Sequence, residues 1–177
     1  PRGVNTGIVN QSRTYQDKLP FTAPTEPLNT RLCEYLLQQE GFNIESTPDK
    51  ARSCPRWVRR GFQLFQRLNG FGYAPYPKED TPRQSLETRG DAVFWRFLEG
   101  KVPLPSSLEG RIQRQLILYD HDLPIPDAMD FFYEITRFKL MQGDLPDQDI
   151  HSFEELNALA AALIAWLGAN EPDQIEL

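Results

Sequence analysis

The sequence predicts a helix-rich α/β domain with only a few short strands, and three observations lead to this fold class. Apolar residues recur at helical spacing through most of the chain. Two Ser-x-x-Glu capping boxes, Ser106 with Glu109 and Ser152 with Glu155, mark the starts of helices. The segments that look like strands are short and bounded by glycine or proline. With 177 residues the chain is expected to form a single domain, residues 1–177, with a sizeable core.

Local signals along the chain justify each element in turn. Residues 1–27 contain four prolines and two glycines, which predict a loop-rich entry. Pro55 suits the first turn of a helix capped by Ser53, and Gly143 suits the end of a helix that Asp127 opens. Helices are expected over residues 28–40, 54–68, 91–99, 107–119, 127–142 and 153–168. Extended segments are expected over residues 71–77, 83–89 and 175–177.

The last predicted helix is apolar on nearly every side. Residues 156–167 contain one polar residue, Asn157. A helix with this pattern needs cover on more than one side. Four alanines would let a sheet or another helix approach it closely: Ala158, Ala161, Ala162 and Ala165. The strands that the sequence shows are too few for a good sheet. We therefore expect the chain to lack strands on which this helix packs.

Composition excludes several classes of function. A net charge of −6 and a pI of about 5.0 argue against broad, non-specific binding of nucleic acid. Cys33, Cys54, His121 and His151 are too few for a zinc site of cysteine and histidine or for a disulfide framework. A reducing compartment, the cytoplasm, is the expectation. The longest apolar run, within residues 158–167, is too short to span a bilayer, so no membrane partner is expected.

Aromatic residues fall at helical spacing and are expected to lie in the core. They are Trp57, Phe62, Phe65, Trp95, Phe97, Phe131, Phe132 and Trp166. Cys33, on a predicted helix, is likewise expected to be a small buried hydrophobic residue.

Seven stretches follow one another in an order and spacing that together cover most of the chain. They are PRGVNTG (1–7), RLCEYLL (31–37), WVRRGFQLFQRLNGFGYAPYP (57–77), RQSLETRGDAVFWRFLEGKVPLP (83–105), LEGRIQRQLILYD (108–120), DAMDFFYEITRFKLMQG (127–143) and ELNALAAALIAWL (155–167). In this order they resemble a family of predicted nucleases, the domain-of-unknown-function family 429, which is thought to have an RNase H-like fold.

The resemblance implies that the chain is the C-terminal portion of an RNase H-like α/β domain that lacks its N-terminal strands. In that family a loop like GVNTG directly follows a strand that ends in an Asp-Ala-Pro motif. Pro1 would be the proline of this motif, with the strand and its aspartate upstream. Residues 175–177 would begin a strand that continues further.

The resemblance also implies chemistry. RNase H-like nucleases cut phosphodiesters with divalent ions, Mg²⁺ or Mn²⁺, held by clustered carboxylates. Two ligand positions carry over: Glu87, in SLETR, matches an acidic residue at a strand end, and Asn157 matches an aspartate in an Asp-Ala-Leu pattern. Two departures stand out. The amide of Asn157 brings no negative charge, and residues 88–90 lack the family's proline after the glutamate.

Structural interpretations of the same residues stay open. Glu87 suits a solvent-facing strand position, and Asn157 suits a polar position one turn into a helix. Asp91 suits the N-cap of the helix that follows it. Arg111 and Arg114 share one helix face and could contact a phosphate backbone, which makes nucleic acid a possible partner.

Pairing of these two arginines with acidic neighbours such as Glu134 is the favoured interpretation in an acidic chain. Two functions are therefore carried forward. The first is a metal-dependent nuclease of RNase H-like type, inactive as this fragment. The second is a non-catalytic RNase H-like scaffold that binds protein or nucleic acid. A third reading, an unrelated helical interaction domain, would be favoured by a structure without any mixed sheet. The sequence leaves the oligomeric state open.

Overall fold

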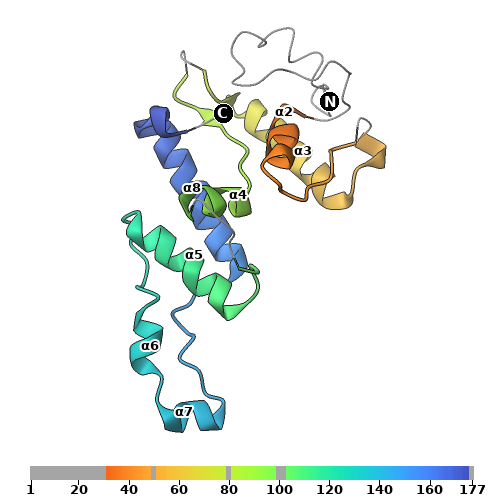
Figure 1. Cartoon of the computed structure of the whole chain (residues 1–177). Helices are drawn as coiled ribbons and strands as arrows, with labels where there is room; N and C mark the ends of the chain where they lie inside the picture. The colour runs from red at the N-terminus through yellow and green to blue at the C-terminus, as the bar shows by residue number, and fades with distance from the viewer. Residues whose placement is uncertain (1–30, 49–50, 79–80, 99–102, 176–177) are drawn as a thin grey trace. The chain divides into compact units, whose positions relative to one another are not determined.

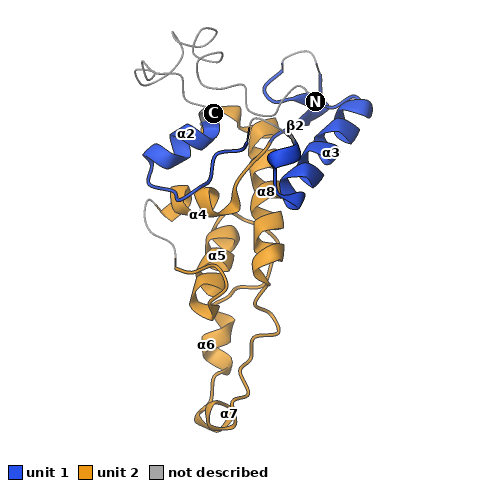
Figure 2. Cartoon of the chain, turned by 90° about the vertical axis from the view of Figure 1, so that its right-hand side faces the viewer, with its two compact units in different colours: residues 1–86 blue, residues 87–177 orange. Residues whose placement is uncertain are grey.

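The computed structural model describes residues 31–48, 51–78, 81–98 and 103–175. It is helix-rich with a small two-stranded parallel sheet, which agrees with the mixed α/β composition expected from the sequence (Figure 1). The chain divides into two compact units, the first ending at Leu86 and the second beginning at Glu87 (Figure 2). Each unit is described by itself. The single domain over residues 1–177 stays a prediction, and the loop-rich entry over residues 1–27 lies outside the described residues.

The first unit begins with a helix that a buried carboxylate ties to the loop behind it. Helix α2 (Leu32–Gln39) falls within the expected residues 28–40. Glu34, in its first turn, accepts hydrogen bonds from the backbone N–H groups of Arg31 at 3.2 Å and Thr47 at 3.0 Å. One carboxylate therefore satisfies the start of α2 and fixes the segment that follows it. Cys33, expected to be buried, is exposed on this helix.

Helix α3 (Arg56–Gly70) follows a short 3₁₀ turn, η2 (Ala51–Ser53). The expected Ser53 cap is wrong, because Ser53 belongs to the 3₁₀ turn and Pro55 occupies the N-cap position of α3. Pro55 has an extended ψ of 155°, which lets the chain enter the helix without a side-chain cap.

The sheet joins two very short strands, β1 (Ala74–Pro75) and β2 (Gln84–Ser85), in parallel. The backbone N–H of Ala74 donates to the carbonyl oxygen of Arg83 at 2.9 Å, and that of Tyr76 donates to Ser85 at 3.0 Å. The extended segments expected over residues 71–77 and 83–89 are thus confirmed only at their centres.

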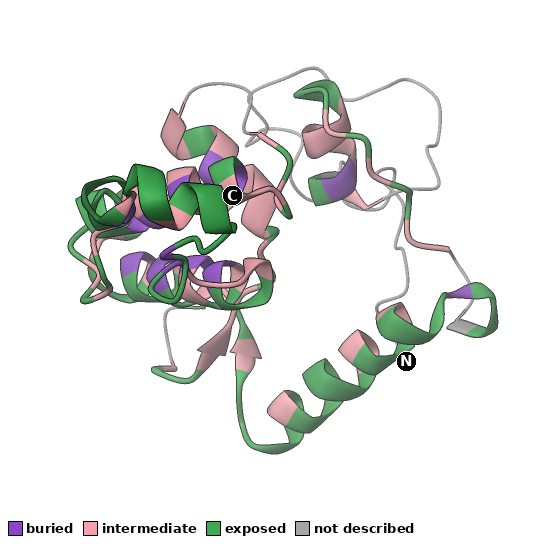
Figure 3. Cartoon of the chain, turned by 90° about the horizontal axis from the view of Figure 1, so that it is seen from below, coloured by how far each residue is buried: buried purple, intermediate pink, exposed green. Residues whose placement is uncertain are grey.

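The second unit is built from helices that pack together. They are α4 (Gly90–Leu98), α5 (Leu108–Asp120), α6 (Asp130–Glu134), α7 (Arg137–Gln142) and α8 (Phe153–Asn170), followed by the 3₁₀ turn η3 (Pro172–Gln174). Helices α4 and α5 both pack on α8 and on each other. The buried residues gather on these helices (Figure 3). The core cluster contains Val93, Phe94, Ile117, Leu118, Leu156, Ala160, Leu163 and Leu167.

Helix α8 starts at the predicted capping box. The hydroxyl of Ser152 accepts from the backbone N–H of Glu155 at 3.3 Å, and the Glu155 carboxylate accepts from the Ser152 N–H at 2.8 Å. The backbone N–H of Ser152 and its hydroxyl both donate to the Glu155 carboxylate at 2.8 Å, and these bonds lower the pKa of Glu155 below its ordinary value. Along the helix one stripe is buried: Leu156, Ala160, Leu163 and Leu167. Three of the four alanines expected to face a close neighbour are exposed: Ala158, Ala162 and Ala165.

Two helix boundaries differ from the expectation. The Ser106 cap is wrong: Ser107 is the N-cap of α5, and its hydroxyl accepts from the backbone N–H of Gly110 at 3.0 Å. The single helix over residues 127–142 is also wrong. Ile135 is extended, with φ −69° and ψ 116°, and the hydroxyl of Thr136 caps α7 instead. Gly143 ends α7 in the left-handed conformation, as predicted.

The α6–α7 segment, residues 126–149, leaves α5 and returns to α8. A buried glutamine of α5 holds its two ends together. Gln115 is fully buried. Its side-chain nitrogen donates to the carbonyl oxygens of Pro126 at 2.9 Å and Asp149 at 2.8 Å, and its oxygen accepts from the His151 N–H at 2.8 Å. One side chain therefore joins the chain where it leaves α5 to the chain where it approaches α8.

The expectation that the aromatic residues form the core is only partly right. Phe131 is buried, whereas the exposed fractions are 75% for Trp57, 52% for Phe132 and 53% for Trp166. Phe94, which the sequence did not single out, is fully buried. Helical spacing identifies an apolar face but does not say whether another element covers it. Residues 176–177, part of the expected last strand, lie outside the described residues.

Candidate functional site

Asn157 lies in the contact between α4 and α8. A Cβ atom at position 90 would collide with its side-chain oxygen and would also come within 2.8 Å of its Cγ atom. Gly90 is the first residue of α4, so the absence of a side chain there lets the two helices approach closely. The one polar residue of the stretch 156–167 is thus packed against the start of a neighbouring helix.

The side-chain oxygen of Asn157 is buried without a hydrogen-bond partner in the described part of the chain. A buried acceptor left unpaired costs about 1–3 kcal/mol. Native structures contain few such atoms, and each calls for a specific reason. Close packing against Gly90 explains why the atom is buried, but it does not supply the missing donor.

Glu87 lies in the link between β2 and α4, two residues after the end of the strand, and it is exposed. It precedes Gly90 by three positions. Three residues of extended chain reach about 10 Å at most, so the backbone of Glu87 lies within that distance of Gly90. Packing therefore brings the two positions that the family resemblance singled out, Glu87 and Asn157, to the same end of α4.

A second polar contact at the start of α4 involves a buried arginine. Arg114 is 1% exposed, and its guanidinium lies 3.3 Å from a carboxylate oxygen of Asp91. It also donates to the carbonyl oxygens of Pro103 at 3.1 Å and Gly110 at 3.0 Å, and it lies over the Phe94 ring. These contacts join the first turn of α4 to the start of α5.

The expected N-cap role of Asp91 is therefore wrong, because Asp91 is the second residue of α4 and turns its carboxylate to Arg114. Burial also leaves Arg114 no surface to offer a phosphate backbone, so the predicted nucleic-acid contact does not fit this side chain.

Arg111 is likewise engaged within the second unit. Its guanidinium lies 3.7 Å from a carboxylate oxygen of Asp147 and 3.5 Å from the carbonyl oxygen of Ile150. Both arginines thus make ion pairs, as the favoured interpretation has it, but with different partners. Glu134, suggested as an acidic neighbour, pairs with Lys139 at 3.7 Å instead.

The donor set at the start of α4 does not fit a Mg²⁺ or Mn²⁺ site. These ions prefer several oxygen ligands, of which carboxylates supply the negative charge. Glu87 brings one charge and Asn157 brings none, while Asp91, which follows Gly90 in the chain, is paired with Arg114. Within the stretches that the structure describes, no three or more histidine, cysteine, aspartate or glutamate residues group to hold a metal ion. No chemical step is therefore derived through a metal here.

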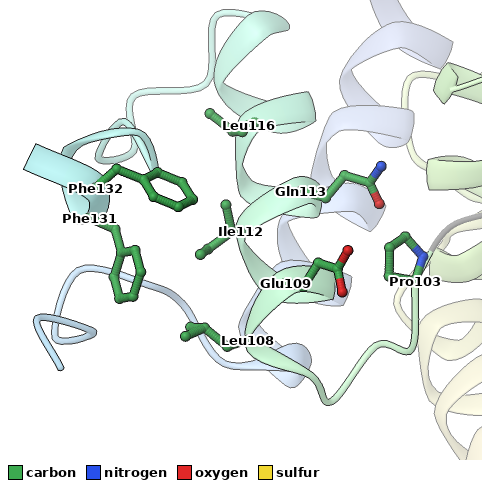
Figure 4. Close-up of a pocket in the computed structure, with 8 residues that line it drawn as sticks. All are labelled: Pro103, Leu108, Glu109, Ile112, Gln113, Leu116, Phe131 and Phe132. Atoms are coloured by element: carbon green, nitrogen blue, oxygen red, sulfur yellow. The ribbon is translucent and has the colours of Figure 1, made fainter. Parts of the chain in front are cut away.

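A groove of about 610 Å³ lies over α5. Helix α5 forms its floor, α6 forms one wall and Pro103 lies at the other edge (Figure 4). The apolar side chains are Leu108, Ile112, Leu116, Phe131 and Phe132. Phe132 is 52% exposed, so an apolar surface remains open to a ligand here.

The polar side chains of the groove come from α5. Glu109 and Gln113 lie on the side of α5 that faces Pro103 (Figure 4). The side-chain oxygen of Gln113 is buried and lacks a hydrogen-bond partner within the described residues. The groove therefore combines an apolar floor with a carboxylate and an unsatisfied amide oxygen. The sequence did not predict this groove, because Phe131 and Phe132 were both expected to lie in the core, whereas Phe132 is exposed.

No helix in the described ranges combines the length and the apolar character that crossing a membrane requires. Comparisons with protein-family models, with curated proteins and with solved structures find no match to this chain. The resemblance to the predicted nucleases therefore stays a prediction.

Proposed function

We propose that this chain is a non-catalytic scaffold of RNase H-like type that binds a protein segment in the α5 groove. The observation that carries the proposal is the packing at the start of α4. The amide oxygen of Asn157 packs against Gly90, and the carboxylate of Asp91 pairs with the buried Arg114. Asn157, Asp91 and Arg114 thus hold neighbouring helices together at the start of α4, and this role is structural. The described residues form one two-stranded parallel sheet and no mixed sheet, which favours the third alternative, an unrelated helical interaction domain; the RNase H-like part of the proposal rests on the sequence resemblance alone.

The chemistry of the groove selects the partner. An apolar floor favours an apolar segment, and the exposed carboxylate of Glu109 favours a cation or a hydrogen-bond donor on it. Acidic residues outnumber basic ones in residues 103–175, which disfavours the phosphates of nucleic acid. The expected partner is thus an apolar protein segment that carries lysine or arginine.

A cleavage assay tests the non-catalytic half of the proposal. The full chain is incubated with single- and double-stranded DNA and RNA in Mg²⁺ and in Mn²⁺. We expect no metal-dependent cleavage from the chain. Metal-dependent cleavage that Glu87→Gln abolishes would overturn the proposal, because Glu87 would then be a catalytic ligand.

A peptide panel tests the binding half. Apolar peptides that carry lysine are compared with matched peptides that carry glutamate, and binding is measured by fluorescence anisotropy. We expect the lysine peptides to bind more tightly and Glu109→Lys to reverse the preference. Phe132→Ala should weaken binding, whereas Tyr133→Ala should not, since Tyr133 is 82% exposed and does not line the groove. Equal binding of both peptide sets contradicts the proposal.

One observation favours the second candidate, a metal-dependent nuclease of RNase H-like type. Packing brings the positions of Glu87 and Asn157 to the same end of α4, as shared ligation would require. Asn157→Asp adds the missing charge, so metal-dependent cleavage by this variant alone would favour an ancestral nuclease whose chemistry has been lost.

A further inference from the structure

Helix α3, in the first unit, separates its side chains into two chemically opposite faces. At 100° per residue, one face carries only arginine, glutamine and glycine, with Arg56, Arg59, Arg60 and Arg67 as its charges, whereas Asn69 falls among the apolar residues. The other face carries the apolar side chains Trp57, Val58, Phe62, Leu64, Phe65 and Leu68. The helix contains no acidic residue.

Among the described residues, the apolar face of α3 is only partly covered: Val58, Phe62 and Leu68 are half-buried. No residue of α3 is buried. The exposed fractions are 75% for Trp57, 56% for Leu64 and 36% for Phe65. The turn after the helix continues the same character, because Phe71 is 70% exposed and Tyr73 is 37% exposed. Contiguous exposed apolar surface of this kind marks an interaction site.

The charge of this stretch is opposite to that of the whole chain. Residues 51–78 contain six arginine or lysine residues and no aspartate or glutamate, although the chain has a net charge of −6. Such local asymmetry points to an anionic partner. A basic amphipathic helix with tryptophan, phenylalanine and leucine on its apolar face is the pattern of a helix that lies in a membrane interface.

We propose that α3 binds an anionic phospholipid surface, lying flat with its apolar face at the boundary between headgroups and acyl chains. The arginines on its flanks would reach the lipid phosphates while their stems pack along the apolar surface. With 15 residues the helix is about 22 Å long, so it lies on the bilayer and does not cross it. This inference is independent of the protein-binding groove.

The two faces of α3 favour lipid over the other anionic partners. Nucleic acid would be held by the arginine face alone, and its binding would leave the exposed tryptophan and phenylalanine in water. A protein groove would need only a narrow stripe of anchors spaced at three and four residues. A lipid surface accepts the whole apolar face, which is wide and rich in aromatic residues, together with the cations beside it.

Vesicle flotation with the full chain tests the proposal. The probes are vesicles of phosphatidylcholine alone and vesicles that also contain phosphatidylserine. We expect binding to the anionic vesicles, weak binding to the neutral ones, and release by added salt, because the electrostatic attraction is screened. Equal binding to both vesicles, or to neither, overturns the proposal.

Variants on the two faces sharpen the test. Each arginine near an anionic surface is worth about fivefold in affinity, so Arg59→Gln with Arg60→Gln should weaken binding roughly 25-fold. Arg137→Gln, exposed on α7, is the matched control and should have little effect. Trp57→Ala should weaken binding about tenfold, whereas Trp166→Ala, 53% exposed on α8, should not.

Competition separates lipid from nucleic acid. Circular dichroism first confirms that each variant keeps its helix content. Single- and double-stranded RNA and DNA are then titrated against the same variants. If the arginine variants lose nucleic-acid binding while Trp57→Ala keeps it and vesicle binding is absent, the anionic partner is nucleic acid and the lipid proposal is wrong.

Discussion

Helices α3 and α8 have opposite patterns and opposite roles. Helix α3 has the cleaner separation of apolar and polar faces, yet none of its residues is buried. Helix α8 is apolar on nearly every side, and one of its stripes supplies half of the core cluster of the second unit. An amphipathic pattern therefore tells which face is apolar, whereas the presence of α4 and α5 decides which face contributes to stability.

The largest expected difference between the two regions comes from removing an aromatic ring. Phe94→Ala, in the core formed by α4 and α8, should destabilise the protein by about 3–5 kcal/mol through lost burial and a new cavity. Trp57→Ala, on α3, should change stability by less than about 0.5 kcal/mol. Urea unfolding followed by circular dichroism measures both. Similar losses from the two variants would mean that α3 has a covered face.

The buried arginine gives the next largest effect. Arg114→Ala should cost about 3 kcal/mol, because it removes three hydrogen bonds and leaves the carboxylate of Asp91 without its cation. Arg111→Ala is the matched control on the same helix. Its ion pair with Asp147 is more exposed, so its loss should cost at most about 1 kcal/mol. Comparable thermal shifts in the two variants would contradict the structural role of Arg114.

Glycine replacements should act in opposite directions in the two regions. Gly90→Ala should destabilise by about 1–3 kcal/mol, since its Cβ meets Asn157, and Asn157→Ala in the same chain should restore most of the loss. Gly61→Ala, on α3, has open space around its Cβ and should stabilise the helix by about 0.5–1 kcal/mol. A double-mutant cycle without coupling between positions 90 and 157 would refute the close approach of α4 and α8.

The smallest expected effect lies at the start of α8. Ser152→Ala removes the cap and should cost about 1 kcal/mol. The hydrogen bonds from Ser152 lower the pKa of Glu155 in the folded chain, so their stabilisation is present above the pKa of the unfolded state. It is lost as the pH falls through the lower, folded value. The urea midpoint should therefore fall in acid less steeply in Glu155→Gln than in the parent. Helix α3 contains no acidic residue and should contribute no such slope.

Local signals predicted where most of the helices lie, but several of the predicted caps were wrong. The capping box at Ser152 and the end of α7 at Gly143 depend on neighbouring residues and are confirmed. The choice between Ser106 and Ser107 depended on a contact, because the Ser107 hydroxyl also donates to the carbonyl oxygen of Leu104. The break at Ile135 was missed because the aromatic spacing of α6 and α7 continues across it.

The candidate site was less predictable because its contacts join distant parts of the chain. Residue types identified Glu87 and Asn157, but they could not indicate that Asn157 would pack against Gly90. The same holds for the pairing of Asp91 with Arg114. Glycines and ion-pair partners acquire these roles only when two helices meet, and no local pattern specifies that meeting.

The hydrogen bonds of Gln115 to the two ends of the α6–α7 segment determine where this chain can accept insertions and replacements. Both ends of the segment are attached to the same side chain, so the distance between them is set without the residues in between. Ala128 and Phe131 pack against Ile112 of α5, so segments of other lengths or sequences can be grafted in place of α7, which buries no residue, while α5 and α8 keep their geometry. That makes α7 the natural place for insertion, deletion or the transplantation of a new recognition element.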